Sequence, residues 1–269
     1  MSIPTPTDND GLPKRLADFA TLPEALDYAA TGQTGFNFYN ARGQLTAVLP
    51  FADLSAQAKK AARHILGAGV NSGERLALLA ETSPAFLIAL FACQYAGVIP
   101  VPMPTPVAFG RRDAYVDQIR NQIKACDAIA VVASADFLPF VNEAVRGISL
   151  HFCSTLEDLY KKPIKDQLSP GNPEDLCYIQ YSSGSTRFPK GVAITHANLM
   201  ANCKAMNDAV GNAPGERAVS WLPFYHDMGL VGFMFGCLTS QTTVDYLPTE
   251  EFARRPVTWL RIISANCGT

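Results

Sequence analysis

Short apolar runs alternate with segments of helical periodicity through the first half of the chain. The run from Leu76 to Ala80 suits a buried strand. Ser83-Pro84 then opens a helix that continues to about Tyr95, and Val98 to Val101 forms the next apolar run. Because parallel strands need a crossover connection, a strand, a helix and a strand in this order indicate a parallel sheet. The alternation predicts an α/β fold with mostly parallel sheets flanked by helices.

The same reasoning divides the rest of the chain into elements. Further helices are expected at Leu54 to Leu66, Tyr115 to Cys126, Phe137 to Arg146, Ala197 to Ala209 and Phe252 to Ser264. Further strands are expected at Ala128 to Ala133, Ser149 to Cys153, Leu176 to Tyr181, Val192 to Thr195, Ala218 to Leu222 and Thr243 to Leu247. The apolar segment Met228 to Leu238 is expected to form a helix or a turn.

A polar segment separates the two halves of this pattern. It covers 159–175 and holds Pro163, Pro170 and Pro173, which is typical of a surface connector. We therefore expect a first α/β subdomain over 1–158, a connector over 159–175 and a second subdomain over 176–269.

Composition and charge exclude several classes of protein. The 269 residues are 48% apolar and 17% charged, as in globular proteins, and the net charge of −2 shows no basic excess for nucleic acid or an anionic membrane. The longest apolar stretch, Phe86 to Met103, contains Pro100 and Pro102. It therefore predicts a buried helix followed by a strand rather than a membrane span.

The cysteines and the amino-terminal residues bear on the compartment. The seven cysteines are scattered, odd in number and never paired as C-x-x-C. This pattern favours buried thiols in a reducing cytosol over disulfides or a zinc site. Residues 1–13 are polar and proline-rich, unlike a secretion signal. We expect a cytoplasmic protein.

The stretch from Ser182 to Gly191 reads Ser-Ser-Gly-Ser-Thr-Arg-Phe-Pro-Lys-Gly and lies between two expected strands. Its small residues allow a tight turn, its hydroxyls donate hydrogen bonds, and Arg187 and Lys190 add positive charge. A polyphosphate needs many donors in a concave turn together with cations. A Walker loop is excluded because Lys190 precedes Gly191, and the G-x-S-x-G of a serine nucleophile is absent. The alternative is a Ser/Gly hairpin turn without a ligand.

Three stretches together resemble the adenylate-forming superfamily, which includes acyl-CoA synthetases, nonribosomal-peptide adenylation domains and luciferases. Tyr181 to Val192, followed by Thr195-His196, resembles its phosphate-loop signature. Gly69 to Pro104 resembles its shared amino-terminal region. Ser220 to Leu230, with the sequence Ser-Trp-Leu-Pro-Phe-Tyr-His-Asp-Met-Gly-Leu, is most similar to the fatty acyl-AMP ligase branch. The implied architecture is an incomplete amino-terminal domain of the adenylate-forming fold.

The resemblance implies a two-step reaction. The carboxylate of a fatty acid attacks the α-phosphorus of ATP to give acyl-AMP and pyrophosphate, and the acyl group then passes to the thiol of an acyl carrier protein. The implied cofactors are ATP and Mg²⁺, with the Thr186 hydroxyl near the metal. The residues implied to bind ATP are Ser182, Ser183, Gly184, Ser185, Thr186, Arg187, Lys190 and Gly191. Family members usually carry glycine at the position of Arg187. The arginine would either add a phosphate contact or face solvent, and it would be mildly strained if the position needs a positive φ.

His226 is the implied catalytic residue, because the matched histidine lies beside the reacting carboxylate. An ordinary turn hydrogen bond is the alternative. Asp227 would pair with His226 or cap a helix that starts near Met228. The residues implied to contact the substrate are Trp221, Phe224, Tyr225, Asp227, Met228 and Gly232. For Phe224, Met228, Phe233 and Met234, a plain core position is an equal alternative. His64 is expected at the surface, and His196 in a structural role.

Family members continue beyond the position of Thr269 with adenosine-binding and catalytic lysine motifs. The resemblance therefore implies an amino-terminal portion, and we expect this chain alone not to make acyl-AMP. Two rival functions remain open. One is an acyl-CoA synthetase, with the same first step and CoA as the acceptor. The other is a non-catalytic interaction domain of the same fold.

Overall fold

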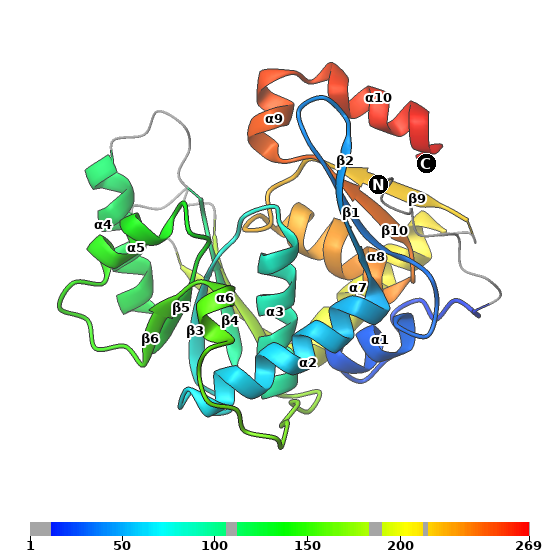
Figure 1. Cartoon of the computed structure of the whole chain (residues 1–269). Coiled ribbons are helices and arrows are strands. Elements are labelled where there is room, and N and C mark those ends of the chain that lie inside the picture. Colours follow the sequence, from blue (N-terminus) through cyan, green and yellow to red (C-terminus); the bar gives the residue numbers. More distant parts are fainter. Residues whose placement is uncertain (1–11, 106–111, 183–189, 212–214, 269) are drawn as a thin grey trace. The chain divides into compact units, whose positions relative to one another are not determined.

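The computed structural model describes residues 12–105, 112–182, 190–211 and 215–268. These residues form two compact units, one built from 12–56, 82–84 and 196–268 and the other from 57–81 and 85–195. Each unit holds its own sheets (Figure 1). Each unit combines segments that are separate in the sequence. The predicted subdomains before and after a connector at 159–175 therefore stay a prediction.

The first unit is built on a sheet with the strand order β2-β1-β10-β9. Its strands are β1 (Gly35–Tyr39), β2 (Leu45–Pro50), β9 (Arg217–Ser220) and β10 (Thr243–Tyr246). The pairs β1–β10 and β10–β9 are parallel, and β1–β2 is antiparallel. Aromatic rings fill the core beside this sheet, where Phe36 packs edge-on against Phe51 at 4.9 Å and lies 5.5 Å from Tyr246.

The second unit is built on a fully parallel sheet with the strand order β4-β3-β5-β6. Its strands are β3 (Arg75–Leu79), β4 (Ile99–Met103), β5 (Ala130–Val132) and β6 (Phe152–Ser154). The antiparallel pair β7 (Leu176–Tyr181) and β8 (Gly191–Thr195) completes the unit, with β7 beside β4. The predicted α/β fold with mostly parallel sheets flanked by helices is confirmed.

Helices connect most of the strands. They are α1 (Leu22–Ala29), α2 (Phe51–Gly67), α3 (Pro84–Ala96), α4 (Arg112–Ala125), α5 (Leu138–Ala144), α6 (Leu156–Leu159), α7 (His196–Val210), the π-helix η1 (Met228–Phe235), α8 (Gly236–Thr239), α9 (Thr249–Arg254) and α10 (Val257–Asn266). The apolar stretch Phe86 to Met103 forms α3 and β4, as predicted. Of the helices described, none is both long and apolar enough to cross a membrane.

Three elements before Leu54 were not predicted: α1, β1 and β2. β1 reads Gly-Phe-Asn-Phe-Tyr and is buried at every position, because it lies inside the sheet. A buried asparagine in a short strand weakens the apolar signal that sequence analysis depends on. α1 has a clear local origin, since the Thr21 hydroxyl accepts a hydrogen bond from Glu24 N and Pro23 occupies the first turn.

The single helix predicted from Phe252 to Ser264 is wrong. The chain forms α9 and α10 there, separated at Arg255-Pro256. Proline disfavours the helical conformation in the residue before it, and Arg255 has φ −149° and ψ 76°, outside the helical region. Pro256 therefore ends one helix and begins the next.

Two histidines, His64 and His196, have structural roles. His64 was expected at the surface, but it is buried, and its Nδ1 lies 2.8 Å from the backbone oxygen of Lys162. The prediction failed because the connector covers this end of α2. His196 has the expected structural role, since its Nδ1 accepts a hydrogen bond of 3.2 Å from Leu22 N. The cysteines are free, and Cys93, Cys126, Cys177 and Cys203 are buried as predicted, whereas Cys267 is exposed.

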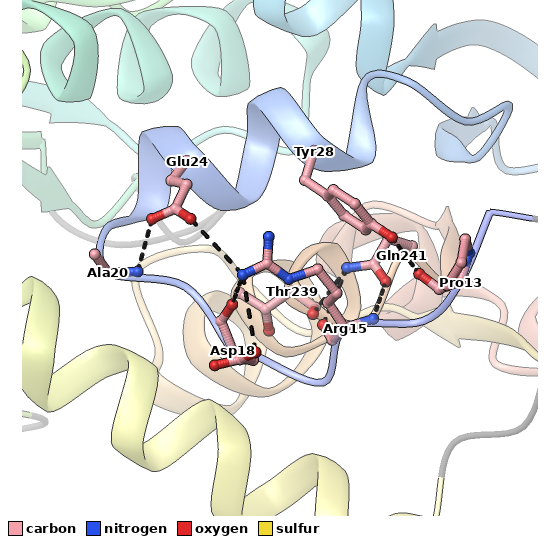
Figure 2. A network of polar contacts seen from close by, with 8 residues as sticks. All are labelled: Pro13, Arg15, Asp18, Ala20, Glu24, Tyr28, Thr239 and Gln241. Carbon is pink, nitrogen blue, oxygen red and sulfur yellow. Dashed lines mark hydrogen bonds and ion pairs between the residues drawn. The ribbon is translucent and has the colours of Figure 1, made fainter.

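Arg15 holds the segment before α1 against the rest of the first unit (Figure 2). Its guanidinium lies 4.1 Å from the ring centre of Phe19 and 3.7 Å from a Glu24 carboxylate oxygen. Its backbone N–H donates to the Gln241 side chain at 2.8 Å, and the same side chain donates back to its carbonyl at 3.2 Å. This segment is thereby bonded to the residues that follow α8.

Candidate functional site

The β7–β8 hairpin brings together the two ends of the predicted phosphate loop. Tyr181 pairs with Gly191 in the antiparallel register. One step further, Ser182 N donates to the Lys190 carbonyl at 2.9 Å, and Lys190 N donates to the Ser182 hydroxyl at 3.2 Å. These two bonds close the neck of the loop, so that it starts and ends at one place.

The residues inside the loop lie outside the described residues. They include Ser183, Gly184, Ser185, Thr186 and Arg187, among them the predicted Mg²⁺ ligand and the unusual arginine. At the neck, Ser182 and Lys190 are both exposed. The Ser182 hydroxyl oxygen accepts from Lys190 N, and the Lys190 side chain adds positive charge beside it.

Gly191 lets the two strands approach closely at the neck. A Cβ atom built there would lie 3.1 Å from Ile179 Cγ2 and 3.7 Å from Tyr181 Cε1. Both neighbours belong to β7 and pack against the apolar cluster between α4 and the parallel sheet. The Tyr181 hydroxyl donates to the backbone oxygen of Gln122 in the last turn of α4, at 2.9 Å. The hairpin is therefore anchored to its own unit through β7.

The second predicted group follows β9 in the other unit. Ser220 ends the strand, its carbonyl accepts from Leu247 N at 2.9 Å, and its hydroxyl accepts from Leu222 N at 3.2 Å. The Trp221 ring stacks on Phe252 with centroids 3.8 Å apart and planes 4° from parallel. Phe224 is fully buried and meets Tyr246 edge-on at 4.8 Å. These contacts fix the turn that carries His226.

His226 and Asp227 form a close pair at the start of η1. His226 Nδ1 lies 2.6 Å from Asp227 Oδ1, and the same carboxylate oxygen accepts from Met228 N at 2.7 Å. A contact this short with a carboxylate requires a proton on Nδ1, so we assign the 3.3 Å approach of Met228 N to Nδ1 no hydrogen bond. Asp227 thus fulfils both predicted alternatives, as partner of the histidine and as N-cap of the helix.

Asp227 contacts the Nδ1 side of the imidazole ring, and Nε2 lies on the opposite side of the ring. His226 is about half exposed, with 49% of its side chain accessible. With Nδ1 protonated, Nε2 accepts a hydrogen bond in the neutral ring and donates one in the charged ring. In the charged form it can therefore orient a carboxylate oxygen.

The helix after His226 is a π-helix, a rare form that occurs frequently at functional sites. Gly229 is required there, because a Cβ atom would lie 2.2 Å from the Pro223 carbonyl oxygen. Gly232 is less confined, since its nearest neighbour would be the Met228 sulfur at 3.0 Å. The turn from Pro223 to His226 is therefore in direct contact with the first turn of the helix.

The predicted substrate contacts fall into two groups by burial. Phe224 and Met234 are fully buried, as in the core alternative, whereas Met228 is 55% exposed. Tyr225 is partly buried, and burial, followed by the charge of Glu250, raises the pKa of its hydroxyl. Tyr225 therefore stays a neutral hydrogen-bond donor at physiological pH. Met228 and Tyr225 are thus accessible to a ligand, while Phe224 supports the turn from inside.

The predicted residues thus collect in two places, at the hairpin neck of one unit and at the η1 turn of the other. The residues that hold these places, chiefly Gln122, Tyr246 and Phe252, were not predicted from the sequence. Their contacts come from distant segments, and no local pattern marks them. Among the described residues, no cluster of three or more His, Cys, Asp or Glu side chains is arranged to hold a metal ion.

Comparison with known proteins places this geometry in a family. The family model described as AMP-binding enzyme matches residues 38–269. A Caulobacter vibrioides protein named "Putative acyl-CoA synthetase" is 46% identical over 98% of this chain and 46% of its own length. The medium-chain-fatty-acid–acyl-carrier-protein ligase JamA of Moorena producens is 32% identical over 92% of this chain and 43% of its own length.

A solved structure agrees with these matches. It comes from work on the fatty acyl-adenylate ligases of E. coli and L. pneumophila, and it superposes with a TM-score of 0.92 at 45% identity, covering 95% of this chain and 46% of that one. The chain spans about half the length of the curated relatives it matches. The family model, the relatives and the shared fold lead to one conclusion: the chain belongs to the AMP-binding, adenylate-forming enzyme family.

Proposed function

We propose that the full-length protein activates a fatty acid with ATP and passes the acyl group to the thiol of an acyl carrier protein. In the first step a carboxylate oxygen attacks the α-phosphorus, and the bond to the departing pyrophosphate breaks. In the second step the thiolate attacks the acyl carbon, and AMP leaves. The observation that carries the proposal is the closed neck between Ser182 and Lys190, which joins the ends of the phosphate signature.

The proposed roles follow from chemistry at each place. Lys190 and the Ser182 hydroxyl bind the β- and γ-phosphates together with Ser183, Gly184, Ser185, Thr186, Arg187 and Gly191. Charge builds up on these phosphates in the transition state, and fixed donors and cations stabilise it. Thr186 would hold Mg²⁺, which would neutralise phosphate charge; this role rests on the sequence motif.

His226 orients the reacting carboxylate in this proposal. The Asp227 contact at 2.6 Å fixes the ring and leaves Nε2 for the substrate. The binding site for the acyl chain is formed by Tyr225, Met228, Trp221, Phe224 and Gly232. Trp221 and Phe224 act through packing, because their rings contact Phe252 and Tyr246 respectively. Positioning of this kind accounts for much of the rate in transfer reactions.

Two thiols are candidates for the acceptor of the second step, that of a carrier protein and that of CoA. Similarity to a carrier-protein ligase and to a fatty acyl-adenylate ligase structure supports a carrier thiol. The 46% identity to a protein named as an acyl-CoA synthetase favours CoA as the second candidate. Both candidates share the first step.

One incubation separates these candidates. The full-length protein is mixed with a series of fatty acids, ATP and Mg²⁺, first with CoA and then with a phosphopantetheinylated carrier protein, and the products are identified by mass spectrometry. We expect acyl-AMP with CoA and acyl-carrier thioester with the carrier protein. Rapid acyl-CoA formation would overturn the carrier assignment. Absence of ATP consumption with every acid would overturn both and favour a non-catalytic interaction domain.

A further inference from the structure

The Tyr181 hydroxyl lies where the hairpin meets α4. Tyr181 is the last residue of β7, directly before Ser182. Its hydroxyl is 2.9 Å from the carbonyl oxygen of Gln122, which belongs to the last turn of α4. Carbonyl groups at the end of a helix carry partial negative charge, so a hydroxyl donor is favourable there. This bond ties the strand that leads into the loop to a helix that packs on the parallel sheet.

The surroundings keep this hydroxyl a donor and its ring in place. Burial raises the pKa of the Tyr181 hydroxyl, and the neighbouring Cys126 and Asp127 raise it further. The ring packs on the cluster that contains Val116 and Ile119 of α4, and its edge faces Gly191 across the hairpin. One side chain thus contacts α4 and both strands of the hairpin.

We infer that Tyr181 is a positioning residue for ATP, which holds the neck formed by Ser182 and Lys190 at a fixed place through its bond to Gln122. The inference rests on the proposed function, because ATP is the ligand that the neck serves. Ser182 directly follows Tyr181, so the position of Tyr181 determines the position of the Ser182 backbone. Lys190 is hydrogen-bonded to Ser182 in both directions, so its position depends on Tyr181 as well.

The bond can be removed without creating an unpaired buried group. The Gln122 carbonyl also accepts the helical hydrogen bond from Cys126 N at 3.0 Å, so it keeps a partner when the tyrosine hydroxyl is lost. Tyr181→Phe keeps the ring and its packing. The variant should therefore fold, which makes it a clean probe of position.

A second tyrosine in the same unit provides the matched control. The Tyr115 hydroxyl donates to the Pro104 carbonyl at 3.1 Å, and Tyr115 belongs to the same apolar cluster. Tyr115→Phe removes a bond of the same type that involves neither strand of the hairpin. A loss of general stability would affect both variants alike, whereas a loss of loop position would affect Tyr181→Phe alone.

The test measures the KM for ATP, the KM for fatty acid and kcat of acyl-AMP formation by the full-length protein. For Tyr181→Phe we expect the KM for ATP to rise about three- to tenfold, the range that one lost hydrogen bond produces, with an unchanged KM for fatty acid. Tyr115→Phe should match the wild type. Equal ATP constants in the two variants would overturn the inference and leave the proposed function intact. A wild type that forms no acyl-AMP would overturn the proposed function, and the inference with it.

Hydrogen exchange gives a readout that does not depend on activity. The amide protons of Ser182 and Lys190 are bonded across the neck. We expect both to exchange faster in Tyr181→Phe than in Tyr115→Phe, with matched melting temperatures. Unchanged exchange at these two amides would contradict the positioning role even if the kinetics shifted.

Discussion

Arg217 and Asp245 form a two-armed ion pair between neighbouring parallel strands. Arg217 Nε lies 2.7 Å and Nη2 lies 2.8 Å from the two carboxylate oxygens of Asp245, which is fully buried. Asn37 and Asn266 each donate to the same carboxylate at 2.7 Å. The network links β1, β9, β10 and α10, and β9 leads directly into the turn that carries His226.

Removal of the arginine should therefore destabilise the first unit severely. Arg217→Ala leaves a buried carboxylate without its charge partner, and we expect the free energy of unfolding to fall by about 3–5 kcal/mol. Urea denaturation measures this. The control is Arg254→Ala, whose partner Glu251 is 3.5 Å away in an exposed pair, and which should cost less than about 0.5 kcal/mol. Similar losses in both variants would contradict the role given to the buried pair.

Gly229→Ala should disturb the turn before η1. Its new Cβ would lie 2.2 Å from the Pro223 oxygen, so the backbone must shift, at a cost of about 1–3 kcal/mol. Gly232→Ala meets only the Met228 side chain at 3.0 Å, and alanine is the better helix former, so this variant should be neutral or slightly stabilising. Thermal unfolding and the KM for fatty acid compare the two. If Gly232→Ala proved the more harmful, the described approach of Pro223 to the helix would be wrong.

Arg15→Ala should loosen the segment before α1. The change removes the guanidinium from the Phe19 ring and from Glu24, and we expect a loss of about 1–2 kcal/mol. Arg15→Lys keeps the charge but not the planar group, so it should recover only part of the loss. Urea denaturation ranks the three proteins. Full recovery by lysine would show that charge alone accounts for the contact.

Stability should fall in alkali through the Cys203 thiol. Burial raises the pKa of this thiol from its ordinary value of 9.0 to about 12, although a hydrogen bond with Thr239 lowers it. The unfolded chain therefore releases the proton above pH 9.0 while the folded chain retains it, so the free energy of unfolding falls as pH rises from that value. From pH 8 to pH 10 this thiol should contribute a loss of about 1.4 kcal/mol.

A pair of variants isolates that contribution. Urea denaturation at the two pH values should show a smaller alkaline loss in Cys203→Ala, by the stated amount, than in the wild type. Cys267→Ala, at an exposed thiol, should retain the wild-type loss. Identical pH dependence in all three proteins would refute a buried neutral thiol at Cys203.

The elements that sequence analysis predicted well are those with a strong local signal. β7 was predicted with the bounds that it has, because an apolar run between prolines and a glycine-rich loop marks both ends. The break at Pro256 shows the opposite case, where an apolar period continued across a residue that forbids a continuous helix. β1 was not predicted from the sequence, because its burial comes from its place inside the sheet and not from an apolar run.

The site was predicted through motifs, and the structure adds what the motifs cannot contain. The sequence indicated that Asp227 would either pair with His226 or cap a helix, and one carboxylate oxygen does both. The anchor from Tyr181 to Gln122 spans 59 positions in the chain, so no spacing rule reveals it. Long-range contacts of this kind depend on the assembled sheet and helices.

Fatty-acid-dependent exchange of labelled pyrophosphate into ATP measures the proposed formation of acyl-AMP without any later step. Exchange requires both substrates and a reversible first step, and it needs no acceptor thiol. The proposed reaction predicts exchange by the full-length protein only when fatty acid and Mg²⁺ are present, and a fall of about 10²–10³-fold in Lys190→Ala, as for other lost groups that stabilise transition-state charge. No exchange with any fatty acid, or an unchanged rate in Lys190→Ala, would contradict it.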